Sequence, residues 1–349
     1  MNTAIHDGIW RWREHMIPQV DDQFIVRVEQ GAGDTPLLRA HRLEEFFQQR
    51  FGVRIVIYLL LEGKNPTGSF KDRGMEFAIA CALQDGFRSF AVASTGNTSA
   101  SVAAHTAKAG AKDCIVIVPE GIAEGKMTQL YPFSPTIRVV SESFDDAYGH
   151  HLKEIVSKNP KLKVMNSSNP DRLEGQKTAA YEIVSKLKQA PDYHFLPVGN
   201  AGNITAYWRG YKECYKNGPI ALSLPKMIGA QAEGAAPLVY GGIIEHPKTV
   251  ASAIKIGNPV HRDNALRAAR ESGGGIFAVN DSRILGAQKF LVDQETVWVE
   301  PASAAPIALL LKTAEKHLIS FKEDDMVVCT LTGAGWKDPD AAKKMRRGH

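Results

Sequence analysis

Short apolar runs rich in β-branched residues alternate with helix-length segments along most of the chain. The expected strands cover 54–62, 89–94, 114–119, 136–140, 162–166, 193–199, 226–231 and 326–332. The pattern between them predicts helices over 97–109, 143–158, 175–188, 203–215 and 302–316. This alternation is typical of an α/β architecture with mostly parallel sheets that helices cover on both faces. In such folds, ligands bind at the carboxyl ends of strands, where helices begin.

Bulk properties narrow the classes of function. The 349 residues are enough for one large or two medium domains, and a net charge of +4 gives no sign of a nucleic-acid or membrane-surface binder. The four cysteines are widely spaced, which favours reduced thiols over a disulfide framework or a zinc site, and we expect no metal. The N-terminus lacks an apolar signal core, and no window reaches about 18 apolar residues. We therefore expect a cytoplasmic protein.

The segment "NPTGSFKDRG" at 65–74 places a lysine, Lys71, among turn-forming and capping residues. Ser69 and Asp72 have the spacing of a short capping box that would open a helix. Lys71 would then lie in the first helical turn and face the positive end of the helix dipole, which disfavours an ammonium ion. This placement makes Lys71 a candidate for chemistry that needs a free amine.

Three junctions between a strand and a helix could hold a ligand. In "STGNTS" at 94–99, small polar residues offer backbone N–H groups and hydroxyls to an anion, although an over-capped helix would look the same. Residues Gly199–Asn203, "GNAGN", could cradle a phosphate at a helix start, or form an ordinary Gly/Asn turn. The third junction ends a buried strand at Thr332, whose hydroxyl could contact a ligand.

Six motifs in order, "NPTGSFKDRG", "STGNTSAS", "NSSNPDRLEGQK", "PVGNAGN", "EPASAA" and "TLTGAGWKDPD", resemble those of threonine synthase. The resemblance extends from about residue 29 to residue 340, nearly the whole chain. That family belongs to the fold type II enzymes, which use pyridoxal 5'-phosphate. The core "SFKDR" is shared across that superfamily, whereas "NPDRLEGQKT" and "GNAGNITA" point more narrowly to threonine synthase.

The resemblance implies a role for each matching position. Lys71 would form the Schiff base, Asn97 would hydrogen-bond the ring hydroxyl of the cofactor, and Thr332 would meet its pyridine nitrogen. The cofactor phosphate would be held by Gly199, Asn200, Ala201, Gly202 and Asn203. The substrate carboxylate would be held by Ser94, Thr95 and Thr98, and the substrate phosphate by Lys64, Asn166 and Arg172.

The implied enzyme is a carbon–oxygen lyase acting on phosphates. It converts O-phospho-L-homoserine and water into L-threonine and phosphate by γ-elimination and β-addition. By the same resemblance we expect a homodimer of two-lobed subunits, each lobe a mostly parallel sheet flanked by helices. A smaller mobile domain would comprise 78–166, and a larger cofactor-binding domain 1–77 and 167–349.

Two departures from the family pattern leave the substrate open. Ala334 and Trp336 stand where relatives usually have His and Leu, and the segment at 28–38 is longer than usual. The alternatives are a paralogue acting on another phosphorylated amino acid, such as a cysteate synthase using phosphoserine, or a threonine or serine dehydratase. A non-catalytic ligand-binding paralogue is the alternative outside the enzymes.

Overall fold

The computed structural model describes residues 7–94, 96–120, 124–140, 151–217 and 223–346. The chain divides into two compact units. Unit 1 comprises Met1–Asp34 and Asn65–Thr178, and unit 2 comprises Thr35–Lys64 and Ala179–His349. The segment 78–166 lies inside unit 1, and its behaviour as a separate mobile domain stays a prediction.

Unit 1 is built on a parallel sheet of four strands in the order β5-β4-β3-β6. Its strands are β3 (Ser89–Ala93), β4 (Asp113–Pro119), β5 (Thr136–Val140) and β6 (Leu162–Val164). Its helices are η1 (Gly8–His15), α1 (Asp22–Val28), α3 (Lys71–Gln84), α4 (Asn97–Lys108), α5 (Glu124–Met127), η3 (Tyr131–Phe133), α7 (Leu152–Lys158) and α8 (Asp171–Leu187), which continues past Thr178 into unit 2.

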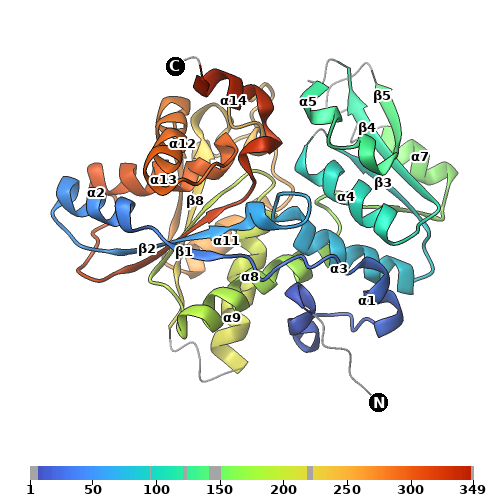
Figure 1. Ribbon diagram of the computed structural model, residues 1–349, viewed down its shortest axis with the longest axis horizontal. Helices are drawn as coiled ribbons and strands as arrows, with labels where there is room; N and C mark the ends of the chain where they lie inside the picture. The colour runs from blue at the N-terminus through green and yellow to red at the C-terminus, as the bar shows by residue number, and fades with distance from the viewer. Residues whose placement is uncertain (1–6, 95, 121–123, 141–150, 218–222, 347–349) are drawn as a thin grey trace. The chain divides into compact units, whose positions relative to one another are not determined.

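Helices cover both faces of this sheet because successive strand residues point to opposite sides. Phe90 and Val92 of β3 belong to the core formed with α3 and α4. Ala91 and Ala93 belong to a second core formed with α7. Figure 1 shows α4 and α7 on the two sides of β3. The buried strands therefore read as continuous apolar runs, as expected for a parallel sheet.

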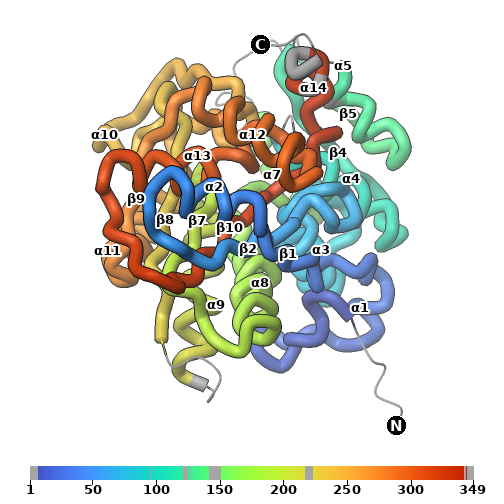
Figure 2. The backbone as a smooth tube through the Cα atoms, turned by 60° about the vertical axis from the view of Figure 1, so that its left-hand side comes forward, coloured from blue at the N-terminus to red at the C-terminus, as the bar shows by residue number. Residues whose placement is uncertain are grey.

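Unit 2 holds a sheet of six strands in the order β1-β2-β10-β7-β8-β9. The labels of these strands follow one another across Figure 2. The strands are β1 (Leu37–Arg39), β2 (Val56–Leu61), β7 (Tyr193–Pro197), β8 (Lys226–Ala232), β9 (Gly275–Val279) and β10 (Met326–Leu331). Only the edge strand β1 is antiparallel, and in the centre Cys329 of β10 pairs with both Leu59 and Phe195.

Helices α12 (Asp281–Glu295) and α13 (Pro301–Glu315) cover one face of this sheet, and α9 (Gly202–Asn217) and α11 (Arg262–Glu271) the other (Figure 1). The remaining elements of unit 2 are α2 (His41–Phe51), η2 (Glu62–Lys64), η5 (Glu233–Ala235), α10 (Pro237–Tyr240), η6 (Ser252–Ile254), η7 (Gly335–Lys337) and α14 (Pro339–Arg346). No helix among the described residues is long and apolar enough to cross a membrane.

The predicted architecture is confirmed, and each of the eight expected strands has a counterpart in the sheets. The sequence pattern missed strands β1 and β9 and helices α2, α11 and α12. Strand β9 follows the glycines at 273–275, a cluster that normally signals a loop. The first half of the expected helix over 143–158 lies outside the described residues, and α7 covers nearly all of its second half.

Candidate active site

Lys71 is the first residue of α3, so the prediction that it lies in the first helical turn is confirmed. The side chain is half-buried, and its Nζ lies 4.2 Å from the centre of the Phe70 ring. The predicted capping box is wrong, since no side chain caps this helix. Ser69 Oγ is buried without a hydrogen-bond partner in the structure.

Asp72 instead binds the turn that precedes the helix. Its carboxylate accepts from the backbone N–H of Thr67 at 2.7 Å and from the Thr67 hydroxyl at 2.6 Å. It also accepts from the hydroxyl of Ser101 in α4 at 2.6 Å. The side chains of all three residues are buried. Asp72 therefore ties the turn that carries Lys71 to the helix that begins at Asn97.

The N-terminus of α4 presents the polar residues that the sequence predicted. Asn97 is the first helical residue and is 8% exposed, while Thr98 and Ser94 are half-buried. The hydroxyl of Ser94 accepts a long hydrogen bond of 3.4 Å from the N–H of Gly96. Thr95 lies outside the described residues. A helix start presents backbone N–H groups and a positive dipole end, which would suit a carboxylate.

Two of the residues predicted to bind the substrate phosphate form hydrogen bonds with backbone groups. Asn166 donates to the carbonyl of Ala93 at 2.8 Å and accepts from its N–H at 3.0 Å. It thereby holds the end of β3, from which the Ser94 segment departs. Arg172, at the start of α8, is 2% exposed and donates to the carbonyl of Met165 at 3.2 Å. Their phosphate role stays a prediction.

The remaining predicted residues belong to unit 2. Lys64 ends η2 and is exposed. Gly199, Asn200 and Ala201 form the turn between β7 and α9, and Gly202 and Asn203 open that helix. Thr332 directly follows β10. The segment Gly199–Asn203 and Thr332 therefore lie at strand ends or helix starts, as the sequence predicted, whereas Lys64 does not.

The turn at 199–203 is closely packed and contains a residue in the left-handed region. A Cβ on Gly199 would lie 3.1 Å from the Cα of Ile254, so a side chain would crowd the turn. Ala201 has a φ of +64°, in the left-handed region. Asn203 donates to the carbonyl of Pro197 at 2.7 Å and accepts from the N–H of Ile204 at 2.9 Å. Its side chain therefore holds the shape of this turn.

Ser303 is a site residue that the sequence reasoning missed. Its Oγ lies 3.0 Å from Oγ1 of Thr332 and accepts from the N–H of Gly333 at 2.7 Å. Ser303 and Thr332 are both buried, in the first turn of α13 and after β10. The sequence signal for Ser303 is its place in "EPASAA", one of the motifs that carry the family resemblance.

A buried histidine connects the elements that carry these unit 2 residues. His194 of β7 lies 2.6 Å from the hydroxyl of Thr330 in β10 and 2.9 Å from that of Tyr211 in α9. Burial lowers the pKa of His194 to about 3, so the ring is neutral. It thus joins β10, two residues before Thr332, to α9, which begins in the phosphate turn.

The loop after β10 holds the two unusual residues of the sequence. Ala334 pairs with Val299, and the N–H of Gly335 donates to the carbonyl of Trp298 at 3.1 Å. Trp336 is 48% exposed. The segments at 298–300 and 333–335 therefore form one structural feature beside Thr332.

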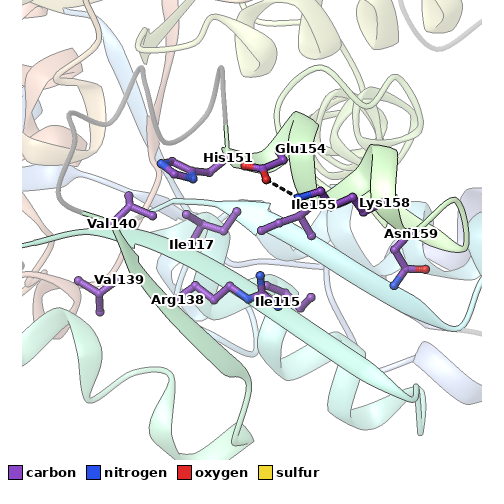
Figure 3. Close-up of a pocket in the computed structure, with 10 residues that line it drawn as sticks. All are labelled: Ile115, Ile117, Arg138, Val139, Val140, His151, Glu154, Ile155, Lys158 and Asn159. Atoms are coloured by element: carbon purple, nitrogen blue, oxygen red, sulfur yellow. Dashed lines mark hydrogen bonds and ion pairs between the residues drawn. The ribbon is translucent and has the colours of Figure 1, made fainter.

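A separate cavity of about 510 Å³ lies in unit 1 between β4, β5 and α7 (Figure 3). Its lining combines aliphatic side chains with polar ones, which include an ion pair of 2.6 Å between Lys158 and Glu154. No predicted site residue lines it. Within the described ranges, no group of three or more His, Cys, Asp or Glu side chains could hold a metal ion.

Each unit by itself carries types of donor group that pyridoxal phosphate requires. Unit 1 supplies an amine at a helix start, and unit 2 supplies a turn with little room for a side chain at Gly199 and a buried hydroxyl pair. An aldehyde, a phosphate and a ring nitrogen are the groups of that cofactor which such residues would contact.

Comparison with known proteins agrees with this chemistry. Residues 28–333 match the family described as "Pyridoxal-phosphate dependent enzyme". The chain is 47% identical over 346 residues to the threonine synthase of Mycobacterium tuberculosis, which covers 98% of this chain and 92% of the relative. It is 46% identical over 345 residues to that of Methanocaldococcus jannaschii, which covers 96% of this chain and 82% of the relative.

Solved structures support the fold. Maize serine racemase gives a TM-score of 0.75 at 18% identity and covers 98% of this chain and 97% of its own. The L-serine ammonia-lyase of Rhizomucor miehei gives 0.76 at 21% identity and covers 90% of this chain and 98% of its own. The chain belongs to the threonine synthase family of pyridoxal-phosphate-dependent enzymes, with their fold type II architecture.

Proposed function

We propose that this chain is a threonine synthase, a carbon–oxygen lyase that converts O-phospho-L-homoserine and water into L-threonine and phosphate. The observation that carries this proposal is the 47% identity, over 98% of the chain, to relatives named threonine synthase. The position of Lys71 at the start of α3 supports it, because the reaction needs an amine that can alternate between covalent and free forms.

Pyridoxal phosphate, when bound, supplies an aldehyde that condenses with amines and a ring that accepts electrons from the attached carbon. We assign the aldehyde to Lys71, the ring hydroxyl to Asn97, and the phosphate to the N–H groups of Gly199–Asn203. The hydroxyl of Thr332, supported by Ser303 at 3.0 Å, would face the ring nitrogen. A neutral hydroxyl protonates that nitrogen less than a carboxylate would, so the ring withdraws electrons more weakly.

The substrate brings a carboxylate and a second phosphate. Ser94, Thr98 and the start of α4 would bind the carboxylate, together with Thr95. Lys64 and Arg172 would bind the phosphate with their positive charges, and Asn166 would orient the adjoining loop through its two hydrogen bonds to Ala93.

Lys71 would also move protons. Its Nζ, when it is a free amine, would take a proton from the substrate Cα and deliver or accept one at Cβ. The positive end of α3 disfavours the ammonium form and so helps to keep this amine basic and unprotonated. Removing Lys71 should therefore abolish turnover, even if the cofactor still binds non-covalently.

A turnover assay with three amino acids tests the proposal. We expect threonine and phosphate from O-phospho-L-homoserine, and no comparable reaction with O-phospho-L-serine or L-threonine. Lys71→Ala should be inactive, and the exposed Lys108→Ala should match the unmodified protein. Phosphate release from phosphoserine alone would point to a cysteate synthase-like paralogue, and ketoacid formed from threonine would point to a dehydratase. A protein that cannot bind the cofactor would contradict both.

We further propose that the enzyme is a cytoplasmic homodimer. The four cysteines, Cys81, Cys114, Cys214 and Cys329, are free thiols, which suits a reducing compartment. The dimer rests on the family resemblance. Light scattering of the purified protein would measure its mass, and a monomeric mass would contradict the dimer.

A further inference from the structure

Two carboxylates and a histidine form a buried charge cluster in unit 1. The cluster consists of Asp72 and Glu76 in α3 and His105 in α4, and each of these side chains is 0% exposed. Ionisable side chains are rarely buried so completely unless they are paired and hydrogen-bonded. The reaction described above assigns no task to Glu76 or His105.

Both carboxylates accept several hydrogen bonds. Asp72 has the three donors described above. Glu76 accepts from the indole of Trp10 at 2.7 Å and from the N–H groups of Gln30 and Ala32 at 3.0 and 3.3 Å. Asp72 and Glu76 lie four residues apart on α3, so their carboxyl groups share one face of the helix.

His105 faces acceptors at both ring nitrogens. Nδ1 lies 2.9 Å from the carbonyl oxygen of Ser101 and 3.9 Å from Oδ1 of Asp72. Nε2 lies 3.5 Å from Oε2 of Glu76, within ion-pair distance but without the geometry of a hydrogen bond. Because a carbonyl and a carboxylate only accept, this geometry suits a ring that carries hydrogen on both nitrogens. Burial lowers the pKa of His105, but the contacts with Glu76 and Asp72 outweigh it and raise the pKa above its ordinary value.

Other charged groups on the neighbouring elements have different contacts. Arg73 of α3 donates to the Thr178 hydroxyl at 3.2 Å, and Arg27 of α1 donates to the carbonyl of Ala109 at 2.7 Å. On β4, burial raises the pKa of Cys114 to about 11, so its thiol is neutral. In the part of the chain that the structure describes, His105 supplies a cation within 4 Å of both Asp72 and Glu76.

We propose that this buried charge cluster is a positioning device for Lys71. Asp72 follows Lys71 directly, and its partner Ser101 lies one turn after Asn97 on the same face of α4. The hydrogen bond between Asp72 and Ser101 therefore fixes the amine relative to the predicted ring-hydroxyl ligand. The inference rests on the functions proposed for Lys71 and Asn97.

His105 lies close enough to both carboxyl groups for a positive charge on its ring to stabilise this arrangement. With His105 neutralised, the carboxyl groups of Asp72 and Glu76 would lie one turn apart without a compensating cation, which would disturb the first turn of α3. Their uncompensated charge would also favour a proton on the nitrogen of Lys71. Position and proton affinity are separate consequences, so they can be measured separately.

Three variants of α4 separate these effects. His105→Gln removes the cation, Ser101→Ala removes one hydrogen bond to Asp72 and leaves every charge in place, and Thr106→Val is a control at a buried neighbour of His105. The full-length proteins are stripped of cofactor and given pyridoxal phosphate. We would measure how fast the absorption band of the Lys71 adduct grows and the pH midpoint of that band. The midpoint of thermal unfolding is measured for each variant as well. Borohydride reduction and mass spectrometry locate the adduct.

We expect His105→Gln to form the adduct roughly tenfold to a hundredfold more slowly, because small misplacements of a reacting group are costly. It should also shift the pH midpoint of the band upward. Ser101→Ala should slow the reaction and leave the pH midpoint unchanged, and Thr106→Val should change neither.

Adduct formation at unchanged rate and pH midpoint in both His105→Gln and Ser101→Ala would overturn the positioning role. The positioning role would also be overturned if, in all three variants, the rate of adduct formation fell only in proportion to the loss of thermal stability. If His105→Gln does not fold, Ser101→Ala alone is decisive. Slower adduct formation at an unchanged thermal midpoint would support the positioning role, and an unchanged rate would overturn it. The absence of a Lys71 adduct in the unmodified protein would instead overturn the proposed function.

Discussion

Gly175→Ala should disturb the site from a distance, because Gly175 of α8 touches the backbone of α3. A Cβ at this position would lie 2.0 Å from the carbonyl oxygen of Arg73 and 3.0 Å from the Cα of Gly74. Neither atom belongs to a side chain that could rotate away. The reciprocal contact is as close, since a Cβ on Gly74 would lie 2.4 Å from the carbonyl oxygen of Arg172.

The cost follows from the size of this overlap. Ordinary van der Waals contact begins at 3.4 Å, so α3 and α8 would have to separate by ~1.4 Å at this point. Overpacking of this kind typically costs about 3 kcal/mol at the upper end of its usual range. The better helix propensity of alanine returns about 1 kcal/mol, which leaves about 2 kcal/mol of lost stability. Arg73 is two residues from Lys71, so the amine should move and kcat/KM should fall by about 100-fold.

The assay pairs urea denaturation with turnover of O-phospho-L-homoserine. Gly286→Ala is the matched control, because Gly286 lies inside α12 and a Cβ there would meet nothing within 4 Å. This control should gain about 0.5–1 kcal/mol and keep its activity. Wild-type stability and turnover in Gly175→Ala would refute the inference that the contact between α3 and α8 positions Lys71.

Three further changes have expected outcomes. Lys71→Ala should leave a protein whose cofactor is removed by dialysis and whose mass shows no adduct after borohydride reduction; a retained adduct would place the covalent bond elsewhere. The raised pKa of His105 in the folded state contributes stability that is fully present below the unfolded pKa, about 6.5, and is lost as pH rises through the higher folded pKa, so urea titrations across this range should show a fall that His105→Gln lacks. In Gly335→Ala, a Cβ would lie 2.2 Å from the ring of Trp298, which is 45% exposed and can swing outward, so we expect a loss of about 1–2 kcal/mol and a red-shifted tryptophan emission. Unchanged emission would mean that the ring has not moved.

Local sequence signals were enough to predict several parts of the site. Lys71 was expected at a helix start because a turn precedes it, and α3 does begin there. A turn was expected at Gly199–Asn203 because glycines follow an apolar run, and the structure has a turn there, between β7 and the start of α9. Such features depend on neighbours in the chain, which is why they can be predicted from short segments.

The hydrogen-bond partners of other side chains could not be predicted, because they lie far away in the sequence. Asp72 suits a capping box by its spacing, but its oxygens bind Thr67 and Ser101, and the latter is 29 residues further along the chain. Asn166, whose predicted phosphate role stays a prediction, hydrogen-bonds the backbone N–H and carbonyl of Ala93, which lies 73 residues away. A polar side chain takes whichever partner folding brings within hydrogen-bond distance, and spacing along the chain does not reveal it.

The sequence by itself determined the class of fold, the family and the amine at a helix start. The alternation of apolar runs sets which segments can be buried in a parallel sheet, and the motifs lie at strand ends and helix starts, where ligands bind. Tertiary structure alone decided that Ser303 supports Thr332 and that His105 lies between Asp72 and Glu76. Burial raises the strength of these contacts and the cost of leaving any of these groups unpaired, so their effect exists only once the helices and strands have packed.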